Sequence, residues 1–142
     1  MLYHMDDFYI TDMKPTILNK NAEVHALLQK SYWAKDRTPA VTRKAIENSL
    51  NYAVFESTTD KLVGYARVVT DHATIYYLCD VYIDEAYRGK GLGKELIEWI
   101  CVHEDKLSGA NGLLKTRDAQ GLYEKFGFKE CQSTCMVKPC QG

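Results

Sequence analysis

The longest hydrophobic pattern in the chain covers residues 74–83, a run rich in Ile, Tyr and Val. In a strand, alternate side chains point to opposite faces. One face then carries Ile75, Tyr77, Cys79, Val81 and Ile83, and the other carries Tyr76, Leu78, Asp80 and Tyr82. Because both faces are largely apolar, the pattern predicts a central strand that is covered on both sides.

Shorter patterns before this run predict three strands and two helices. Alternation favours a first strand over residues 8–13, and residues 52–56 and 62–70 flank turn residues and favour a hairpin. Between them, Asn21 can cap a helix with an apolar stripe at Val24, Leu27, Leu28 and Tyr32. Thr38 and Pro39 favour the start of a second helix, which runs to about residue 50.

The second half of the chain alternates between helices and short strands. The pattern predicts a helix over residues 91–106, a strand over 112–116, a short helix over 118–125 and a last strand over 128–137. The order βααβββαβαβ predicts an α/β (α+β) fold: a mixed, mostly antiparallel sheet of six to seven strands with helices on both faces.

Composition narrows the class of protein. A chain of 142 residues is most simply one domain, residues 1–142, with a formal net charge of −1. This balance gives no overall attraction for nucleic acid or for an acidic membrane, and no apolar run approaches the length of a membrane span. The N-terminus does not resemble a signal peptide, and five cysteines lack metal-ligand spacing. We therefore expect free thiols, no metal and a cytoplasmic location.

The stretch at residues 87–94 carries the clearest chemistry. It reads Tyr-Arg-Gly-Lys-Gly-Leu-Gly-Lys, directly after the central strand and at the start of a predicted helix. The first backbone N–H groups of a helix have no intrahelical partners, and the helix dipole favours an anion there. Glycines leave this backbone uncovered, and Arg88, Lys90 and Lys94 add positive charge. The stretch therefore predicts a site for phosphate or pyrophosphate.

Two motifs together resemble the GNAT superfamily of N-acetyltransferases. The first is Arg88-x-x-Gly91-x-Gly93, which is similar to the family's pyrophosphate signature. The second is Ala119-x-x-Leu-Tyr-Glu-Lys-Phe-Gly-Phe, which is similar to the family's Ala-x-x-Leu-Tyr-Glu-Lys-x-Gly-Phe. Both lie at the expected places in the order of elements. The resemblance covers about residues 8–137.

The resemblance implies acetyl-CoA as the co-substrate and a sheet that splays between its fourth and fifth strands. The pantetheine arm would lie in that gap, along the backbone of Val81, Tyr82 and Ile83. The pyrophosphate would lie against Arg88, Gly89, Lys90, Gly91, Leu92, Gly93 and Lys94. Thr116 stands where many relatives carry an Asn that binds pantetheine, and Asp118 lies nearby.

The reaction that the resemblance implies is direct attack of an amine on the thioester, through a tetrahedral intermediate. Tyr123 is the candidate acid for the departing thiolate, because a phenol is protonated at neutral pH. Asp80, on the central strand, is the leading candidate base or amine-binding group. Asp118, Glu124 and His72 are weaker candidates, and the amine could instead lose its proton to solvent.

The acceptor is less well defined by the sequence. Tyr32 and Trp33, followed by Asp36 and Arg37, lie in a region that borders the acceptor site in the family that the chain resembles. Aromatic groups beside a carboxylate suit a small cationic amine, but they equally suit loop packing. We expect the primary amine of a small molecule as the acceptor. The alternatives are a protein amine and a non-catalytic acyl-CoA-binding or sensor module, and the chain could form a homodimer.

Overall fold

The computed structural model describes residues 2–131 and 135–140. Its centre is one six-stranded sheet whose strands lie side by side in chain order. All neighbouring strands are antiparallel except the fifth and sixth, which are parallel. The strands are β1 (Leu2–Met5), β2 (Phe8–Thr11), β3 (Leu50–Glu56), β4 (Leu62–Thr70), β5 (Ile75–Ile83) and β6 (Asn111–Leu114). This is the mixed, mostly antiparallel sheet that the sequence predicts.

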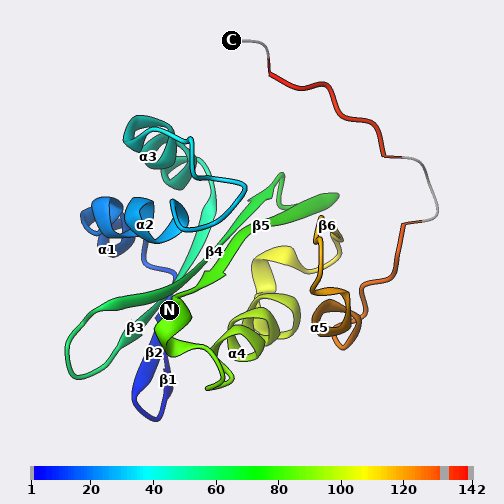
Figure 1. Cartoon of the computed structure of the whole chain (residues 1–142). Helices are drawn as coiled ribbons and strands as arrows, with labels where there is room; N and C mark the ends of the chain where they lie inside the picture. Colours follow the sequence, from blue (N-terminus) through cyan, green and yellow to red (C-terminus); the bar gives the residue numbers. More distant parts are fainter. Residues whose placement is uncertain (1, 132–134, 141–142) are drawn as a thin grey trace.

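Helices cover both faces of this sheet (Figure 1). One face carries α1 (Lys14–Asn19), α2 (Asn21–Leu28) and α3 (Pro39–Glu47). The other carries α4 (Leu92–Glu98), which continues as a π-helical turn over Trp99–His103, and α5 (Gln120–Glu124). Short 3₁₀ turns lie at Glu85–Tyr87 and Asp105–Leu107. Among the described residues, no helix is long and apolar enough to span a membrane.

The sheet separates two hydrophobic cores, and β3 contributes to both. Tyr52 and Val54 pack toward α4, whereas Ala53 and Phe55 pack toward α1, α2 and α3. All four side chains are almost fully buried. Successive side chains of a strand point to opposite faces, so this continuous apolar run is what a strand between two helical layers requires.

The alternation predicted for the central strand is interrupted at Asp80. Tyr65 pairs with Tyr82 and Arg67 pairs with Cys79, so the one residue between them on β4 faces two residues on β5. Asp80 itself has a φ of 52°, in the left-handed region. This β-bulge shifts the pattern by one residue. Val81 and Ile83 therefore pack in the same core as Tyr76 and Leu78, and the predicted assignment of faces is wrong beyond the bulge.

The predicted last strand is also wrong in the part of residues 128–137 that the structure describes. Residues 128–131 and 135–137 form no strand there. Phe128 instead turns back onto α5: its backbone N–H donates to the carbonyl of Tyr123 at 3.3 Å, and the two rings meet edge to face. Beyond this turn, Met136 is 91% exposed, and residues 135–140 lie apart from the sheet (Figure 1).

Two short elements were not predicted from the pattern, and all four predicted helices are shorter in the structure. β1 is an edge strand with no buried residue, and α1 has only six residues, too few for a clear period. The predicted helix over 91–106 keeps α-helical geometry only to Glu98. The predicted cap of α3 is confirmed, because the Thr38 side chain accepts a hydrogen bond from the N–H of Val41 at 3.3 Å.

Candidate active site

The site begins where β5 and β6 separate; these are the fourth and fifth of the predicted strands, because β1 was not predicted. Their parallel pairing starts at Ile75 with Asn111 and ends at Leu78 with Leu114. β5 continues to Ile83, and no strand among the described residues pairs with its outer edge over residues 79–83. The backbone groups on this edge are therefore available to an extended ligand, which can add to a sheet edge as a further strand does.

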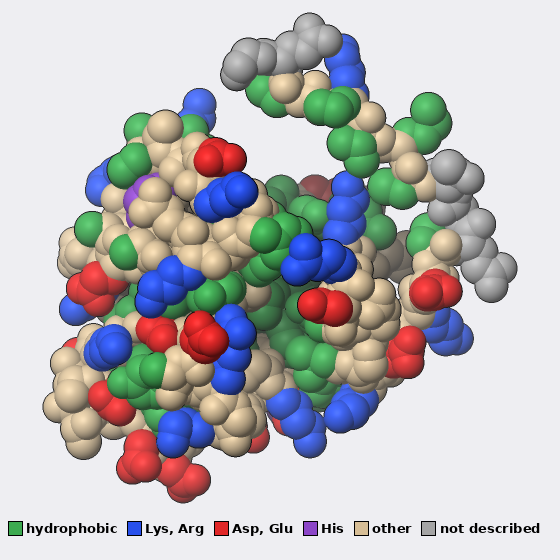
Figure 2. All heavy atoms as spheres, viewed as in Figure 1, with side chains coloured by type: hydrophobic (Ala, Val, Ile, Leu, Met, Phe, Trp, Pro, Cys, Tyr) green, Lys and Arg blue, Asp and Glu red, His purple; other side chains and the backbone are tan. Residues whose placement is uncertain are grey.

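A cavity of about 760 Å³ lies in this gap. Its lining includes the end of β5, residues of the stretch 87–94 (the glycine loop), the loop before α5, and Tyr123. Figure 2 shows the face hollowed at its centre, with hydrophobic side chains in the hollow and Lys and Arg side chains on its rim. A hollow of this size suits a small organic ligand.

The glycine loop presents open backbone to this cavity. Gly89 and Gly91 have φ values of 82° and 78°, a conformation that other residues rarely adopt. Apart from the adjacent residues in the chain, no atom lies within 4 Å of the position of a Cβ at either glycine. Among the described residues, none accepts a hydrogen bond from the N–H of Gly89, Lys90 or Gly91. Gly91 is also the N-cap of α4, whose first N–H groups lack intrahelical partners.

The cations of this loop differ in position. Arg88 lines the cavity, donates from Nε to the carbonyl of Ile83 at 3.1 Å, and lies over the Tyr82 ring at 5.1 Å. Lys90 and Lys94 are exposed and are not part of the described lining. The residues fit an acyl-CoA: a free strand edge for the pantetheine amides, then a glycine loop with unpartnered N–H groups for the pyrophosphate.

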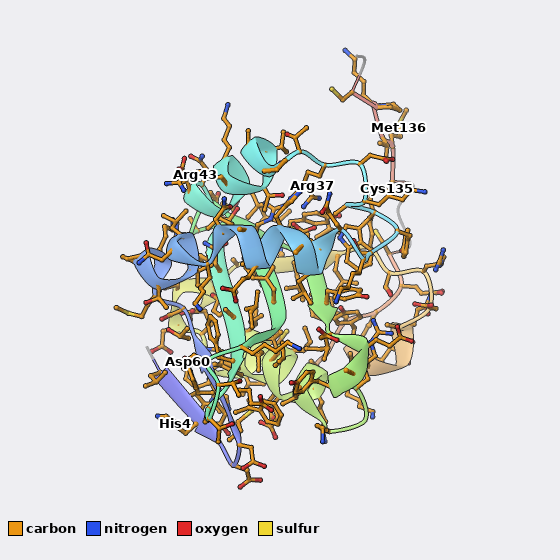
Figure 3. All side chains as sticks on the ribbon, turned by 60° about the vertical axis from the view of Figure 1, so that its left-hand side comes forward. His4, Arg37, Arg43, Asp60, Cys135 and Met136 are labelled. Carbon is orange, nitrogen blue, oxygen red and sulfur yellow. The ribbon has the colours of Figure 1, made fainter. Side chains whose placement is uncertain are left out.

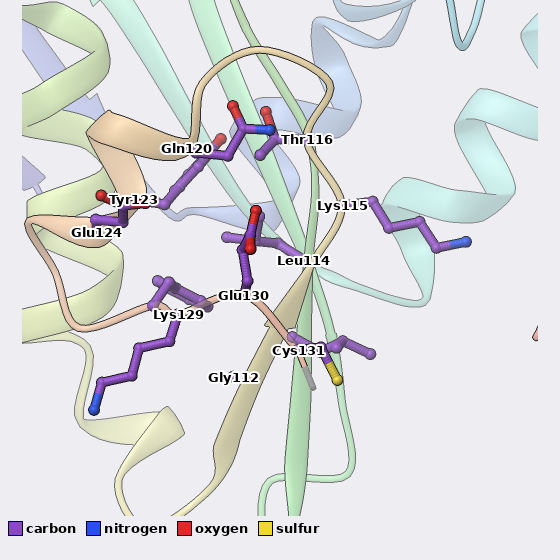
Figure 4. A pocket seen from close by; sticks show the side chains of 12 residues that line it. Gly112, Leu114, Lys115, Thr116, Gln120, Tyr123, Glu124, Lys129, Glu130 and Cys131 are labelled. Carbon is purple, nitrogen blue, oxygen red and sulfur yellow. The ribbon is translucent and has the colours of Figure 1, made fainter. Parts of the chain in front are cut away.

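Tyr123 lies at the junction of three cavities. It lines the cavity of about 760 Å³ in the gap beside β5, which we call the donor cavity. It also lines a second cavity of about 500 Å³ beside Asp80 and a third of about 580 Å³ beside β6. Figure 4 shows the third cavity, with Tyr123, Gln120 and Thr116 near one another at the end of β6. Burial, with a smaller effect of the nearby Cys101, raises the pKa of Tyr123 to about 12. The phenol therefore keeps its proton throughout the neutral range.

Local hydrogen bonds hold the segment that carries Tyr123. The hydroxyl of Thr116 accepts a hydrogen bond from the N–H of Ala119 at 3.0 Å, just before α5. Thr116 lines the cavity beside Asp80, and Asp118 lines both that cavity and the donor cavity. The structure therefore brings Thr116, Asp118 and Tyr123 together around the end of β6.

Asp80 is the centre of a buried ion cluster. Its Oδ1 accepts hydrogen bonds from Trp33 Nε1 at 3.0 Å and Arg37 Nη2 at 3.2 Å, and its Oδ2 accepts from Arg37 Nη1 at 2.8 Å and Arg67 Nε at 2.9 Å. The Asp80 side chain is 3% exposed. Burial alone would raise the pKa of Asp80, but the two guanidinium groups outweigh burial and lower it.

This environment corrects the expectation that Asp80 is the base. Each carboxylate oxygen already accepts two hydrogen bonds, and the lowered pKa makes the group a weak proton acceptor at neutral pH. Of the weaker candidates, His72 and Glu124 lie outside the lining of the cavity beside Asp80, whereas Asp118 is exposed at its rim. Cys79 lies beside the cluster, and burial raises the pKa of its thiol to about 11, which keeps it unreactive.

Tyr32 and Trp33 line both the donor cavity and the cavity beside Asp80 and form a wall between them. Both side chains are substantially exposed. Their rings meet edge to face, and Trp33 meets Tyr82 in the same way. From the opposite wall, the Arg117 guanidinium carbon lies 4.0 Å from the centre of the Tyr32 ring. Of the region that the sequence assigned to the acceptor, Tyr32, Trp33 and Arg37 therefore border the cavity beside Asp80, whereas Asp36 does not line it.

Sequence reasoning missed Arg67 and Arg117. Arg67 is an isolated arginine in an apolar strand, and it meets Asp80 only because of the bulge. Arg117 follows Thr116 in a loop and carries no motif. A cation inside an apolar strand was the one signal that could have indicated a buried partner for Arg67.

Comparison with known proteins identifies the class. Residues 48–130 match the acetyltransferase (GNAT) domain family. A crystal structure of a Xanthomonas campestris protein belonging to the GNAT family is 33% identical, with a TM-score of 0.80 over 91% of this chain and 89% of that one. Glucosamine-6-phosphate N-acetyltransferase from Arabidopsis thaliana has the same fold, with a TM-score of 0.71 over 94% of this chain and 99% of that one at 19% identity.

Curated relatives match shorter regions. The Arabidopsis thaliana protein named GCN5-related N-acetyltransferase 2, chloroplastic, is 50% identical over 72 residues, which are 49% of this chain and 27% of that protein. A Prochlorococcus marinus protein named as an uncharacterized N-acetyltransferase is 35% identical over 81 residues, 55% of this chain and 44% of that protein. The chain therefore spans less than half the length of these two relatives.

The fold with its open strand edge, the family match and the 33% identical structure agree on one class. The chain belongs to the GNAT family of acetyltransferases. The family model that it matches describes an acetyltransferase domain.

Proposed function

We propose that residues 1–142 form a single N-acetyltransferase domain that moves the acetyl group of acetyl-CoA to the primary amine of a small molecule. The observation that carries this proposal is the position of Tyr123 between the donor cavity and the cavity beside Asp80. A donor in the first cavity and an amine in the second would meet at this phenol. The aromatic wall of Tyr32 and Trp33 favours a small acceptor over a protein chain.

On the donor side, the proposal assigns two kinds of contact. The backbone of Val81, Tyr82 and Ile83 would hydrogen-bond the pantetheine arm, with Thr116 and Asp118 near its end. The backbone N–H groups of residues 89–94 and the side chain of Arg88 would bind the pyrophosphate, with Lys90 and Lys94 adding positive charge at the rim. Acetyl-CoA supplies an activated thioester carbonyl.

In the transfer step, the neutral amine attacks the thioester carbonyl carbon and forms the new C–N bond. Strand N–H groups near Val81 would stabilise the charge that develops on the carbonyl oxygen. As the C–S bond breaks, the phenol of Tyr123 gives its proton to the sulfur, and the phenolate recovers a proton from solvent. The proton that the amine loses goes to water in the open cavity, because Asp80 is fully paired.

The direct test measures free thiol released from acetyl-CoA with a panel of amines. Tyr123→Phe removes the proton donor and keeps the ring, so we expect turnover to fall about a hundredfold with little change in acetyl-CoA affinity. Because the pKa of Tyr123 is about 12, wild-type turnover should not fall on the alkaline side before about pH 11.

Tyr76→Phe is the matched control. Tyr76 is also 9% exposed and its pKa is also raised to about 12 by burial, but it does not line any of the three cavities that meet at Tyr123. We expect near-normal turnover for this variant. Tight acetyl-CoA binding with no thiol release for any amine would instead favour an acyl-CoA-binding or sensor module.

We also propose a reducing compartment such as the cytoplasm. Cys131 and Cys135 are free thiols, and both are exposed. Exposed thiols persist where the surroundings keep them reduced. Within the described residues, no group of His, Cys, Asp or Glu gathers to hold a metal ion, and the proposed reaction uses none.

A further inference from the structure

We propose that the acceptor carries an anionic group, a carboxylate or a phosphate, and that the arginine cluster beside Tyr123 binds it. The arginine cluster consists of Arg37, Arg67 and Asp80. This inference rests on the proposed function, because it names the class of amine that the same site takes. It departs from the expectation of a simple cationic amine that the sequence suggested.

Asp80 has no free capacity to bind an ammonium group. A carboxylate oxygen offers two lone pairs, and both oxygens of Asp80 already accept two hydrogen bonds at 2.8–3.2 Å. The donors are the indole of Trp33 and the guanidinium groups of Arg37 and Arg67. A cationic amine would have to displace one of these donors from a group that is 3% exposed.

The cluster has more cationic than anionic charge. Two guanidinium groups share one carboxylate, so the cluster carries a net charge of +1. The side chains of Arg37 and Arg67 are 21% and 15% exposed, and both line the cavity beside Asp80. The other charged residues in that lining, Lys115 and Asp118, cancel each other. A partly buried excess cation favours an anionic ligand.

Unused donors are present on both arginines. Arg37 gives Nη1 and Nη2 to Asp80, and Arg67 gives Nε to Asp80 and Nη1 to the hydroxyl of Ser49 at 3.0 Å. Among the described residues, none accepts from Arg37 Nε or Arg67 Nη2. A guanidinium presents five N–H donors in a fixed plane that matches carboxylate and phosphate oxygens.

The same charge would assist the chemistry. The attacking amine must be neutral, and a nearby positive charge lowers the pKa of an ammonium group. An acceptor held by its anionic end near Arg67 would place its amine toward Tyr123, which lines the same cavity. The cluster therefore offers a reason why the site works without a carboxylate base.

The test compares matched acceptors that differ only in the anionic group. L-phenylalanine against 2-phenylethylamine tests the carboxylate, and phosphoethanolamine against ethanolamine tests the phosphate. In wild type we expect kcat/KM for the anionic member of at least one pair to be higher by about tenfold or more, as for one charge-assisted hydrogen bond. The pair with the larger ratio identifies the anion.

Variants then change the net charge of the cluster in steps. Arg67→Gln lowers the net charge to zero. The ratio of kcat/KM for the anionic member to kcat/KM for the other member of the pair should then be close to one. Asp80→Asn raises the net charge to +2 and should increase the ratio. The double variant Asp80→Asn/Arg67→Gln keeps +1 and should keep a ratio near that of wild type. Comparing ratios across variants cancels the different amine pKa values within a pair.

Arg43→Gln is the control for a general loss of positive charge. Arg43 forms an exposed pair with Glu47 on α3 and lies apart from Arg37 in Figure 3, outside the cavity beside Asp80. The kcat/KM ratio within each pair should be the same for Arg43→Gln as for wild type. Ratios of one or less in wild type, or ratios that do not change between Arg67→Gln and Asp80→Asn, would overturn the proposal while leaving amine acetylation intact.

A binding measurement separates this inference from the proposed function. If no amine is turned over, the acetyltransferase proposal fails, but quenching of Trp33 fluorescence still reports binding of the same four compounds. Trp33→Phe identifies the contribution of Trp33 against that of Trp99. Tighter binding of an anionic member, lost in Arg67→Gln, supports the anion site, and equal binding within both pairs overturns it.

Discussion

The two sides of the cleft are built in different ways. The donor side consists mainly of backbone: one free strand edge at residues 79–83 and one loop at residues 87–94 that are adjacent in sequence. The acceptor side consists of side chains from three distant segments, which meet at Asp80. Backbone groups are the same whatever the side chains are, so they can bind one ligand in many different sequences. A side-chain cluster, in contrast, can change without altering the fold. The donor side should therefore depend on conformation, and the acceptor side on charge.

The largest expected effect concerns the donor side. Gly91→Glu places a side chain and a negative charge at a left-handed position that faces the cavity. We expect acetyl-CoA affinity, measured by calorimetry, to fall about a thousandfold, because like charges about 4 Å apart cost about 4 kcal/mol near a protein surface. Gly109→Glu is the matched control: it has a φ of 83°, equally open space and no part in the donor cavity. Equal losses of acetyl-CoA affinity in both variants would mean that backbone strain, and not contact of the glycine loop with the ligand, is responsible.

The next effect tests the acceptor side as a buried charge cluster. Asp80→Ala leaves two guanidinium groups without their shared partner, and we expect the free energy of unfolding in urea to fall by about 3 kcal/mol. Glu47→Ala removes an exposed pair with Arg43 and should cost less than about 1 kcal/mol. Similar losses in the two variants would show that the Asp80 cluster is no stronger than a surface ion pair.

The pH dependence of the Asp80 effect follows from the direction of its pKa shift. The folded pKa of Asp80 is lowered, so its contribution is complete above the unfolded value of about 3.9 and is lost as the pH falls through the lower folded value. The difference in unfolding free energy between wild type and Asp80→Ala should therefore shrink below about pH 4. A constant difference down to pH 2 would contradict this assignment.

The smallest effect concerns the contact that joins the two sides. Arg117→Gln removes the cation from the Tyr32 ring, and we expect the KM for acetyl-CoA to rise about threefold at unchanged kcat, as for a partly exposed cation–π contact. Tyr32→Leu should have a similar effect. The double variant should add little, because both changes remove one interaction. Additive effects would show that the two residues act independently.

The same difference explains what the sequence could predict. The glycine loop and the α5 motif are local, so the sequence indicated an anion-binding loop, and the resemblance to the GNAT family indicated the role of Tyr123. The Asp80 cluster depends on a bulge that no glycine marks, and so both the face of Asp80 and its pairing with Arg67 were beyond the alternation pattern. The prediction of a last strand failed for a similar reason. Residues 128–137 have a strand-like composition, but Phe128 packs on Tyr123 instead of pairing with a strand.

The parallel pairing of β5 with β6 has a consequence for how the protein folds. It is the one parallel pair among the described strands, and it joins Ile75 to Asn111, whereas hairpins connect β1 to β2, β3 to β4 and β4 to β5. Pairing across a long intervening segment costs more chain entropy than closing a hairpin, so we expect the pairings of β5 with β6 and of β2 with β3 to form after the hairpins. The cleft exists only once β6 has docked. A chain in which only the hairpins have formed therefore has no place to bind its donor.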